Sequence, residues 1–453
     1  MFRKVLIANR GEIALRVIRA CKELGIETVT VHSTADANSL HVRFSDQSVC
    51  IGPPVARDSY LNIPNLLSAI EISGADAVHP GYGFLSENAE FADTLERAGI
   101  AFIGPTGDQI RKMGDKATAK ATVREAGIPL VPGSPGLLDS VEEAREVAEA
   151  IGYPVLLKAS AGGGGKGMKI AMTEQDLAGA FQLARAEALA CFGNGALYME
   201  KLVQRPRHIE VQVLGDKHGN VVHLGERECS LQRRHQKVLE EAPSPLVDEE
   251  MRQQMGEAAV NAAKAIGYNT AGTVEFLADQ DKNFYFIEMN TRIQVEHPVT
   301  EMITGIDLVK QMIRSAAGVP LPFTQEEIKF NGHAIECRIN AEDPVTFAPS
   351  PGAITGYHEP GGLGVRVDSW VHDRAKVLPY YDSLLAKLIV WGEDRDAAVM
   401  RMRWALDEYV IEGIRSTVPF HRRVLRDKTF LSGDLDTGFI ERFLSEDGKD
   451  PAT

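Results

Sequence analysis

A fifteen-residue segment near the middle of the chain, residues 287–301, is dense in side chains that can do chemistry. Its polar members are three carboxylates, an amide, a guanidinium and an imidazole: Glu288, Asn290, Arg292, Glu296, His297 and Glu301. The aromatic and β-branched run just before it predicts a strand. If that strand continues, Glu288 and Asn290 share a face, because strand side chains alternate with period two. Two hard oxygen ligands on one face suit Mg²⁺ or Mn²⁺ bound beside phosphates. We expect Pro298 to end the regular structure.

A second carboxylate for such a metal site is Glu275. It follows Thr273 and Val274 in an apolar run that predicts a strand, and we expect it to pair with Glu288. Two buried carboxylates without a cation would be costly, so with Asn290 they would hold one or two divalent ions.

Residues 226–237 gather positive charge in an otherwise acidic protein. Four cationic or potentially cationic groups fall within five positions: Arg233, Arg234, His235 and Lys237. The sequence leaves two interpretations open, a surface basic patch or a site that binds an anion.

The glycine-rich segment 158–169 reads KASAGGGGKGMK. Four consecutive glycines leave backbone N–H groups uncovered, so this main chain can cradle phosphate oxygens. It is not a P-loop, because Ser160 stands where the first glycine must be. A G-x-G-x-x-G match begins at Gly162, but a predicted strand follows it instead of a helix. Two interpretations remain. One is a flexible linker, and the other, favoured by the predicted strands on both sides, is a glycine-rich hairpin folding over phosphates, with Lys116 and Lys158 as contacts.

Composition narrows the class of protein. The 453 residues are 44% hydrophobic and 25% charged, as in ordinary globular proteins of roughly two to four domains. The net charge of −14 argues against a general nucleic-acid or anionic-membrane surface. The sequence shows neither a signal peptide nor an apolar run long enough for a membrane helix, which favours the cytoplasm. The five scattered cysteines favour free thiols.

Near the N-terminus, strand–helix–strand patterns at residues 5–8, 12–24 and 28–32 predict a parallel sheet. A loop at residues 79–88 follows another predicted strand, and its two glycines flank an aromatic that we expect to be exposed, Tyr82. Four segments follow from the patterns: an open α/β domain over 1–114, a small α+β lid over 115–203, a mixed region over 204–445 and a disordered tail over 446–453.

Six motifs together resemble the biotin carboxylase subunits of bacterial acetyl-CoA carboxylase, which belong to the ATP-grasp superfamily. They are IANRGEIALR (7–16), HPGYGFLSEN (79–88), KASAGGGGKGM (158–168), QRRHQKVLEEAP (232–243), FIEMNTRIQVEHPVTE (286–301) and ECRINAEDP (336–344). The resemblance covers about residues 2–440. It implies an ATP-grasp architecture with an N-terminal open parallel α/β domain, a small glycine-flap lid and a C-terminal mixed domain.

The resemblance also implies a reaction. ATP and bicarbonate would form carboxyphosphate, and biotin on a carrier protein would be carboxylated, the first half-reaction of acetyl-CoA carboxylase in fatty acid synthesis. The alternative is a biotin carboxylase subunit of another split acyl-CoA or pyruvate carboxylase. The implied partners are the biotin carboxyl carrier protein, carboxyltransferase subunits and a second copy of the chain, with the helix bearing Arg16 and Arg19 as interface.

Roles for individual residues come from the same resemblance. ATP would be held by Lys116, Lys158, Gly163, Gly164, Gly165, Glu200, Lys201, Leu202 and His208. Two Mg²⁺ or Mn²⁺ ions would be held by Glu275, Glu288 and Asn290. The biotin side would be lined by Tyr82, Gln232 and His235. Bicarbonate would lie among Lys237, Arg292, Gln294 and the Val295 backbone. Glu296 would be the general base, and Arg338 would stabilise the biotin enolate.

Two other classes of function can be tested against this one. A nicotinamide-dependent oxidoreductase would use the G-x-G-x-x-G match and would bind NADH but not ATP. A binding or assembly protein would keep an ATP site without catalysis, and the intact charged set of residues 275–338 argues against it.

Overall fold

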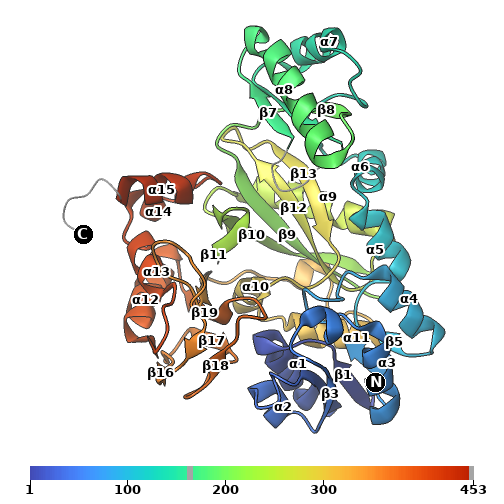
Figure 1. Ribbon diagram of the computed structural model, residues 1–453, viewed down its shortest axis with the longest axis vertical. Coiled ribbons are helices and arrows are strands. Elements are labelled where there is room, and N and C mark those ends of the chain that lie inside the picture. Colours follow the sequence, from blue (N-terminus) through green and yellow to red (C-terminus); the bar gives the residue numbers. More distant parts are fainter. Residues whose placement is uncertain (161–166, 448–453) are drawn as a thin grey trace. The chain divides into compact units, whose positions relative to one another are not determined.

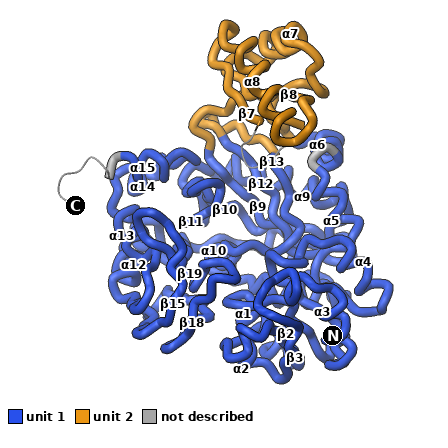
Figure 2. Tube along the Cα trace, in the orientation of Figure 1, with its two compact units in different colours: residues 1–128, 207–278, 287–453 blue, residues 129–206, 279–286 orange. Residues whose placement is uncertain are grey.

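The computed structural model describes residues 1–160 and 167–447, with the side chains of 116, 117, 446 and 447 left out. Contacts divide the chain into two compact units (Figure 2). The first unit comprises residues 1–128, 207–278 and 287 onward, and the second comprises 129–206 and 279–286. The predicted four-part domain division stays a prediction. Of the predicted tail, residues 448–453 lie outside the described residues, and a helix continues to Asp447.

The N-terminal part of the first unit is a five-stranded parallel sheet in the order β3-β2-β1-β4-β5 (Figure 1). Its strands are β1 Lys4–Ile7, β2 Glu27–Ser33, β3 Gln47–Gly52, β4 Ala77–His79 and β5 Ala101–Phe102. The helices are α1 Gly11–Glu23, α2 Leu40–Phe44, α3 Ile63–Ser73, α4 Ala89–Arg97, α5 Gly107–Gly114 and α6 Lys116–Glu125, with a 3₁₀ turn at Ala56–Asp58. The central β1 is buried throughout, which explains its uninterrupted apolar run. The predicted parallel sheet is confirmed.

The second unit packs two helices on a three-stranded antiparallel sheet in the order β7-β6-β8. The strands are β6 Val155–Ala159, β7 Met168–Ala171 and β8 Leu197–Lys201, and the helices are α7 Val141–Ile151 and α8 Glu174–Phe192. Alternate residues of β6 and β8 are buried in the core of this unit: Val155, Leu157, Leu197 and Met199. On β7, Met168 and Ile170 are 38% and 50% exposed, on the face of the sheet that also carries Lys158 and Glu200.

The centre of the first unit is an eight-stranded sheet in the order β13-β12-β9-β10-β11-β14-β19-β17. Its strands are β9 Arg207–Gly215, β10 Val221–Arg233, β11 Gln236–Ala242, β12 Ala271–Ala278, β13 Phe284–Asn290, β14 His333–Asn340, β17 Val365–Ser369 and β19 Leu384–Gly392. The packed helices are α9 Glu249–Ala265, α10 His297–Thr304 and α11 Leu308–Ala316. Neighbouring strands from β12 through to β17 pair antiparallel.

The C-terminal part of this unit adds short strand pairs and four helices. They are β15 Gly352–Ala353 with β18 Lys376–Val377, β16 Gly356–His358 with β20 Val410–Glu412, α12 Arg395–Glu408, α13 Val418–Val424, α14 Lys428–Ser432 and α15 Phe439–Asp447, with a 3₁₀ turn at Gln325–Glu327. In the part of the chain that the structure describes, every helix is too short or too polar to cross a membrane.

One prediction about regular structure is wrong. Pro298 does not end regular structure but lies in the first turn of α10, where its missing N–H would have had no helical partner. Of the two interpretations left open for residues 226–237, a surface patch fits the exposed turn residues Arg234 and His235. It does not fit the whole segment, because β10 and β11 run through it and bury Glu226, Arg227 and Glu228.

Candidate active site

Neighbouring strands of the large sheet bring charged side chains together on one face. Glu210 on β9 lies directly opposite Glu275 on β12 and opposite Arg227 on β10. Side chains at directly opposed positions of antiparallel strands project to the same face. Glu210 and Arg227 are fully buried. Isolated charges cannot be stable there, so these strand positions must pair with one another.

Arg227 satisfies its guanidinium inside the sheet. It forms an ion pair with Glu210 and donates hydrogen bonds to Gln212 (2.7 Å), Thr273 (3.1 Å) and Thr300 (3.0 Å). Thr300 belongs to α10, so this one side chain ties three strands to the helix that follows Glu296. Because both groups are buried, the pair fixes the carboxylate of Glu210 in place.

The ammonium group of Lys237 lies among four polar side chains. Its Nζ contacts Glu210 and is 3.0 Å from Glu275 Oε1, 3.0 Å from Gln294 Oε1 and 2.7 Å from Glu296 Oε1. Three carboxylates around one cation leave a surplus of negative charge, which keeps Lys237 protonated and raises its pKa.

Glu275 is the carboxylate shared by most of this network. Its Oε1 accepts from Asn290 Nδ2 at 2.9 Å and from Gln294 Nε2 at 3.0 Å, and its Oε2 is 3.1 Å from His208 Nε2. Burial alone would raise the pKa of Glu275, but Lys237 and His208 hold it well below its usual range. The carboxylate is therefore ionised and able to bind a cation.

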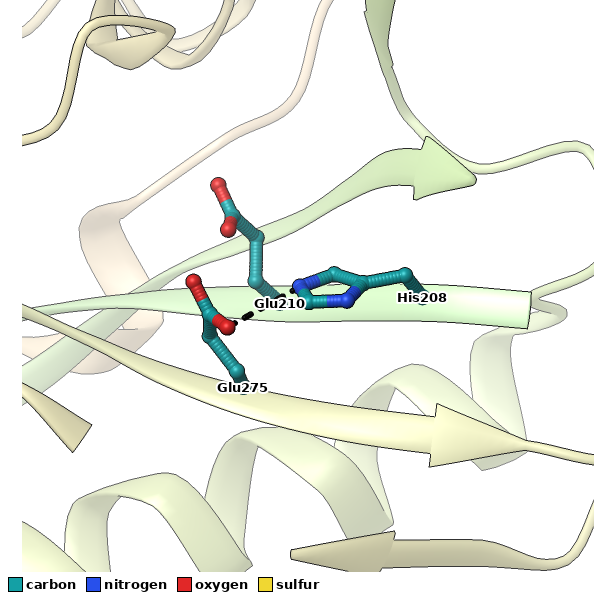
Figure 3. Close-up of side chains that lie close together, drawn as sticks. All are labelled: His208, Glu210 and Glu275. Carbon is teal, nitrogen blue, oxygen red and sulfur yellow. Dashed lines mark ion pairs between the residues drawn. The ribbon is translucent and has the colours of Figure 1, made fainter. Parts of the chain in front are cut away.

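A possible cation position is marked by ligand atoms that converge. One ligand atom each from His208, Glu210 and Glu275 lies within 4.8 Å of the others, and Figure 3 shows the three side chains pointing toward one another. Of the predicted metal ligands, Glu288 is half-buried on β13, beside β12, and Asn290 ends the same strand. The extension of β13 through Asn290 confirms that Glu288 and Asn290 share a face. The metal set itself stays a prediction.

The loop between β13 and α10 carries the predicted bicarbonate residues. Arg292 donates through Nε to Glu87 Oε2 at 2.9 Å and through Nη2 to Asn290 Oδ1 at 3.0 Å. The backbone N–H of Thr291 donates to the other Glu87 oxygen at 3.0 Å. Glu87 thus braces the start of the loop, while Gln294 is fastened to Lys237 and Glu275 at its end.

Glu296 has a cation on each of its oxygens. Its Oε1 is 2.7 Å from Lys237, its Oε2 is 2.9 Å from Arg338 Nη2, and it is 1% exposed. Burial would raise the pKa of Glu296, but Lys237 and Arg338 lower it well below the usual value. Arg338 also donates through Nε to Glu240 Oε1 at 2.6 Å. Burial, opposed by Arg338, raises the pKa of Glu240 to about 7.

The residues predicted on the biotin side lie in three different settings. Tyr82 is half-buried, and its hydroxyl donates to Glu12, so the prediction of an exposed aromatic is wrong. Gln232 pairs with Lys237 across β10 and β11 and donates to the Cys229 carbonyl at 2.9 Å. His235 is exposed at the hairpin turn, with a positive φ of 65°.

Of the predicted nucleotide-binding residues in the second unit, two contact each other and a third has separate partners. Lys158 on β6 forms an ion pair with Glu200 on β8. Lys201 instead donates to the carbonyls of Gly152 and Tyr153 at 2.9 and 2.7 Å. Leu202 directly follows β8 and is half-buried. Three glycines and one side chain lie outside the described residues: Gly163, Gly164, Gly165 and the side chain of Lys116.

Four residues central to this geometry were missed from the sequence: Glu87, Glu210, Arg227 and Glu240. The alternation of residues 208–214 does place Glu210 on the same face as His208, which is the one available signal. The role of Glu210 was missed because both faces of β9 are largely buried, so a polar residue on this strand does not mark a solvent-exposed face.

Comparison with known proteins matches three family domains to successive parts of the chain. The biotin carboxylase N-terminal domain matches residues 1–110, the ATP-binding domain of the carbamoyl-phosphate synthase L chain matches 115–324, and the biotin carboxylase C-terminal domain matches 336–442. Biotin carboxylase 1 of Bacillus subtilis is 56% identical over 445 residues, which cover 98% of this chain and 99% of that protein. A pyruvate carboxylase subunit of Methanothermobacter thermautotrophicus is 54% identical over 444 residues, covering 98% and 90%.

A solved structure agrees with the sequence matches. The biotin carboxylase domain dimer of Hydrogenobacter thermophilus 2-oxoglutarate carboxylase, in complex with MgADP, ADP and bicarbonate, shares 54% identity with a TM-score of 0.88 and covers 98% of both chains. The fold and the matched ATP-binding domain define an ATP-dependent ligase of the ATP-grasp class. Within that class, the chain belongs to the biotin carboxylase family. The predicted family, fold class and enzyme class are confirmed.

Proposed function

We propose that this chain carboxylates biotin with bicarbonate at the expense of ATP, and that the charged cluster around Glu296 is the reaction centre. The observation that carries the proposal is the buried carboxylate of Glu296 between Lys237 and Arg338. Such a group is ionised and lies next to the loop with Arg292 and Gln294. The cationic side chains around it can also form ion pairs with an anionic substrate.

The pKa of Glu296 explains how a strongly acidic group can act as a base. Lys237 and Arg338 stabilise its carboxylate as long as no anionic substrate is bound beside them. A bicarbonate ion bound beside them shares both cations, so they stabilise Glu296 less and its pKa rises toward the ordinary range. The same cations stabilise the carbonate dianion that forms when Glu296 takes the proton.

The later steps also follow from charge. The deprotonated oxygen attacks the γ-phosphorus of ATP, ADP leaves, and carboxyphosphate forms, a transfer that depends on positioning and charge neutralisation. Carboxyphosphate breaks down to CO₂ and phosphate, and the phosphate takes the N1′ proton of biotin. Arg338 stabilises the enolate oxygen of biotin while N1′ attacks CO₂ to give N1′-carboxybiotin.

Divalent cations fit the donor set of the first unit. Glu275 and Glu288 would hold Mg²⁺ or Mn²⁺, with Asn290 as a further oxygen ligand and with His208 and Glu210 close to Glu275. When bound, these ions neutralise charge on the phosphates of ATP. The phosphate-binding lysine Lys158 already contacts Glu200 in the second unit, so ATP would replace one carboxylate partner by phosphate oxygens.

A homodimer is the proposed assembly, because the related biotin carboxylase domain of Hydrogenobacter thermophilus is a dimer. Of the two arginines predicted at its interface, Arg16 is buried against Glu301 and Asp307 at 2.8 and 2.7 Å. The side chain of Arg19 is 54% exposed, lies 3.8 Å from Asp368, and is the more accessible of the two to a partner. The further proposed partners are a biotin carboxyl carrier protein and carboxyltransferase subunits.

Biotin-stimulated ATP hydrolysis tests the function. Purified chain is supplied with ATP, Mg²⁺ and bicarbonate, and phosphate release is measured with and without free biotin. We expect hydrolysis to require bicarbonate and to rise with biotin concentration. A rate that does not respond to biotin would contradict the proposal, and tight NADH binding without ATP binding would favour an oxidoreductase.

The final acceptor of the carboxyl group is a finer question. Acetyl-CoA is our proposal, with pyruvate or another acyl-CoA as the alternative, since a pyruvate carboxylase subunit is also 54% identical to this chain. Affinity purification with the native biotinylated carrier, followed by carboxyl transfer assays to acetyl-CoA and pyruvate, distinguishes them.

A further inference from the structure

Beneath the loop of residues 291–296 lies a lysine that the proposed reaction does not use. Lys387 on β19 is fully buried. Its Nζ donates to the backbone carbonyl of Val295 at 2.8 Å, and it is 3.3 Å from Glu12 Oε2 and 3.9 Å from Asp368 Oδ2. A buried ammonium is costly unless it is paired, so its position is set by these partners.

The position of Lys387 in the sheet brings it close to the proposed reaction centre. Across β14 and β19 it lies directly opposite Arg338, and across β17 and β19 it lies opposite Asp368. Arg338 contacts Glu296 from the same sheet face, one residue beyond the carbonyl that Lys387 holds. Lys387 therefore fixes the backbone of the residue just before the proposed base.

Glu12 links Lys387 to the loop that contains Tyr82. It lies in the first turn of α1, 3% exposed, where the helix N-terminus favours a carboxylate. One of its oxygens faces Lys387 and the other accepts the hydroxyl of Tyr82. Asn9 holds the loop that contains Tyr82, because its side-chain amide donates to the carbonyls of Pro80 and Tyr82, each at 2.7 Å.

These contacts form a continuous chain from the Val295 carbonyl through Lys387 and Glu12 to Tyr82. We propose that Lys387 and Glu12 are a buried positioning pair that sets the Val295 backbone and Tyr82 relative to each other and thereby couples bicarbonate binding to biotin binding. Neither residue touches a substrate. The inference rests on the proposed function, in which the Val295 backbone contacts bicarbonate and Tyr82 lines the biotin side.

The coupling predicts a specific kinetic pattern. Free biotin and bicarbonate are varied together in the ATP hydrolysis assay, giving both KM values and the factor by which one substrate changes the apparent affinity for the other. We expect Lys387→Met to raise the KM for bicarbonate about tenfold, Glu12→Gln to raise the KM for biotin, and either change to bring the coupling factor to one. In Lys387→Met/Glu12→Gln the effects should be smaller than the product of the single changes.

Controls separate positioning from folding. Lys217→Met removes another lysine that caps a backbone carbonyl, that of Ala316 at 2.7 Å, and should leave both KM values unchanged. If Lys387→Met does not fold, the double variant, in which the lost cation is balanced by a lost anion, supplies the measurement. Tyr82→Phe should reproduce the coupling loss of Glu12→Gln.

Two failures remain distinguishable. Wild-type protein without biotin stimulation would overturn the proposed function. A stimulated wild type whose KM values and coupling factor survive both Lys387→Met and Glu12→Gln would overturn the positioning pair alone. A lower melting temperature with unchanged KM values would assign the two residues to stability and would also overturn it.

Discussion

Glu296 and Arg338 show how single side chains are prepared before any substrate arrives. Each oxygen of Glu296 faces a different cation, and Arg338 is held between Glu296 and Glu240. Because the cluster is buried, the groups are already in place and little reorganisation is needed when charge develops. Two residue predictions follow from this arrangement.

Replacement of Glu296 removes the proposed base without disturbing the metal and nucleotide residues. We expect Glu296→Ala to abolish carboxybiotin formation, since no other carboxylate is held by both Lys237 and Arg338 among the described residues. ATP binding, measured by calorimetry, should change little. Wild-type turnover in this variant would remove Glu296 as the base.

Replacement of Arg338 should affect the biotin step more than the bicarbonate step. Lysine keeps the charge but loses the planar fork that reaches Glu240 and Glu296 together. We expect Arg338→Lys to lower carboxybiotin formation about 100-fold while bicarbonate-dependent ATP hydrolysis without biotin falls less. Arg442→Lys, at an arginine on α15 that pairs with Asp436, is the control and should be neutral. Equal losses in both assays would contradict a role specific to biotin.

The β10–β11 hairpin is the element that brings Lys237 to the cluster. Its two-residue turn has positive φ at both central residues, Arg234 (49°) and His235 (65°). Turns of this kind match the twist of a hairpin, but they normally use asparagine and glycine, because other residues are strained in the left-handed region. The turn therefore stores a small amount of strain close to the site.

Relief of that strain is measurable. We expect Arg234→Asn to stabilise the protein by about 1 kcal/mol, because asparagine tolerates the left-handed conformation better than arginine. Arg234→Ala removes the same charge and keeps the strain, so it should not stabilise. Urea denaturation of the three proteins provides the comparison, and equal midpoints for Asn and Ala would show that the backbone conformation is not responsible.

Most elements could be predicted from the sequence, and the exceptions have physical reasons. Apolar runs and helical periodicity locate β1, α1 and β2, because burial on one or both faces determines residue type. The edge strand β3 was missed because its residues are largely exposed. The extension of β10 was missed because Glu226, Arg227 and Glu228 suggested a surface, whereas they are buried in pairs with other elements.

The candidate site could be predicted only in part, because some of its contacts join residues that are distant in the sequence. Motifs placed Lys237, Glu296 and Arg338 in one site, the strand pattern added Glu275, and the structure brings the four together. Local spacing cannot reveal Glu87 or Glu240, because each meets its arginine across a sequence separation of about a hundred residues or more. Such partners depend on how distant strands and loops meet in the folded unit.

At the scale of the whole molecule, buried charge networks join distant parts of the first unit. Glu301 on α10 pairs with Arg16 on α1 and with Arg366 on β17, both at 2.8 Å. Glu241 on β11 pairs with His333 on β14 at 2.7 Å and with Arg395 on α12 at 2.8 Å. Networks of this kind make the stability of the unit depend on pH.

Buried histidines set where acid destabilisation begins. Burial lowers the pKa of His41 and of His421 to about 4 and that of His79 to about 3, from an ordinary value of 6.5. The unfolded chain therefore binds more protons below pH 6.5, so stability is fully present above that pH and is lost as the pH falls toward 4. Each histidine contributes on the order of 3 kcal/mol of this loss.

Denaturant midpoints at pH 7, 6 and 5 check this dependence. We expect the midpoint of the first unit to fall over this range, and to fall less in His41→Leu, which removes one of the buried rings with a lowered pKa. A midpoint that stays constant from pH 7 to 5 would show that these histidines are not kept neutral in the folded protein.

In the proposed reaction, the buried cluster around Glu296 transfers the carbon of bicarbonate to biotin. The most direct measurement is the transfer of radiolabel from bicarbonate to biotin in the presence of ATP and Mg²⁺, with wild-type protein and Glu296→Ala side by side. We predict labelled N1′-carboxybiotin with the wild type and none above background with the variant. Absence of label with the wild type, or equal label with both proteins, would contradict the account.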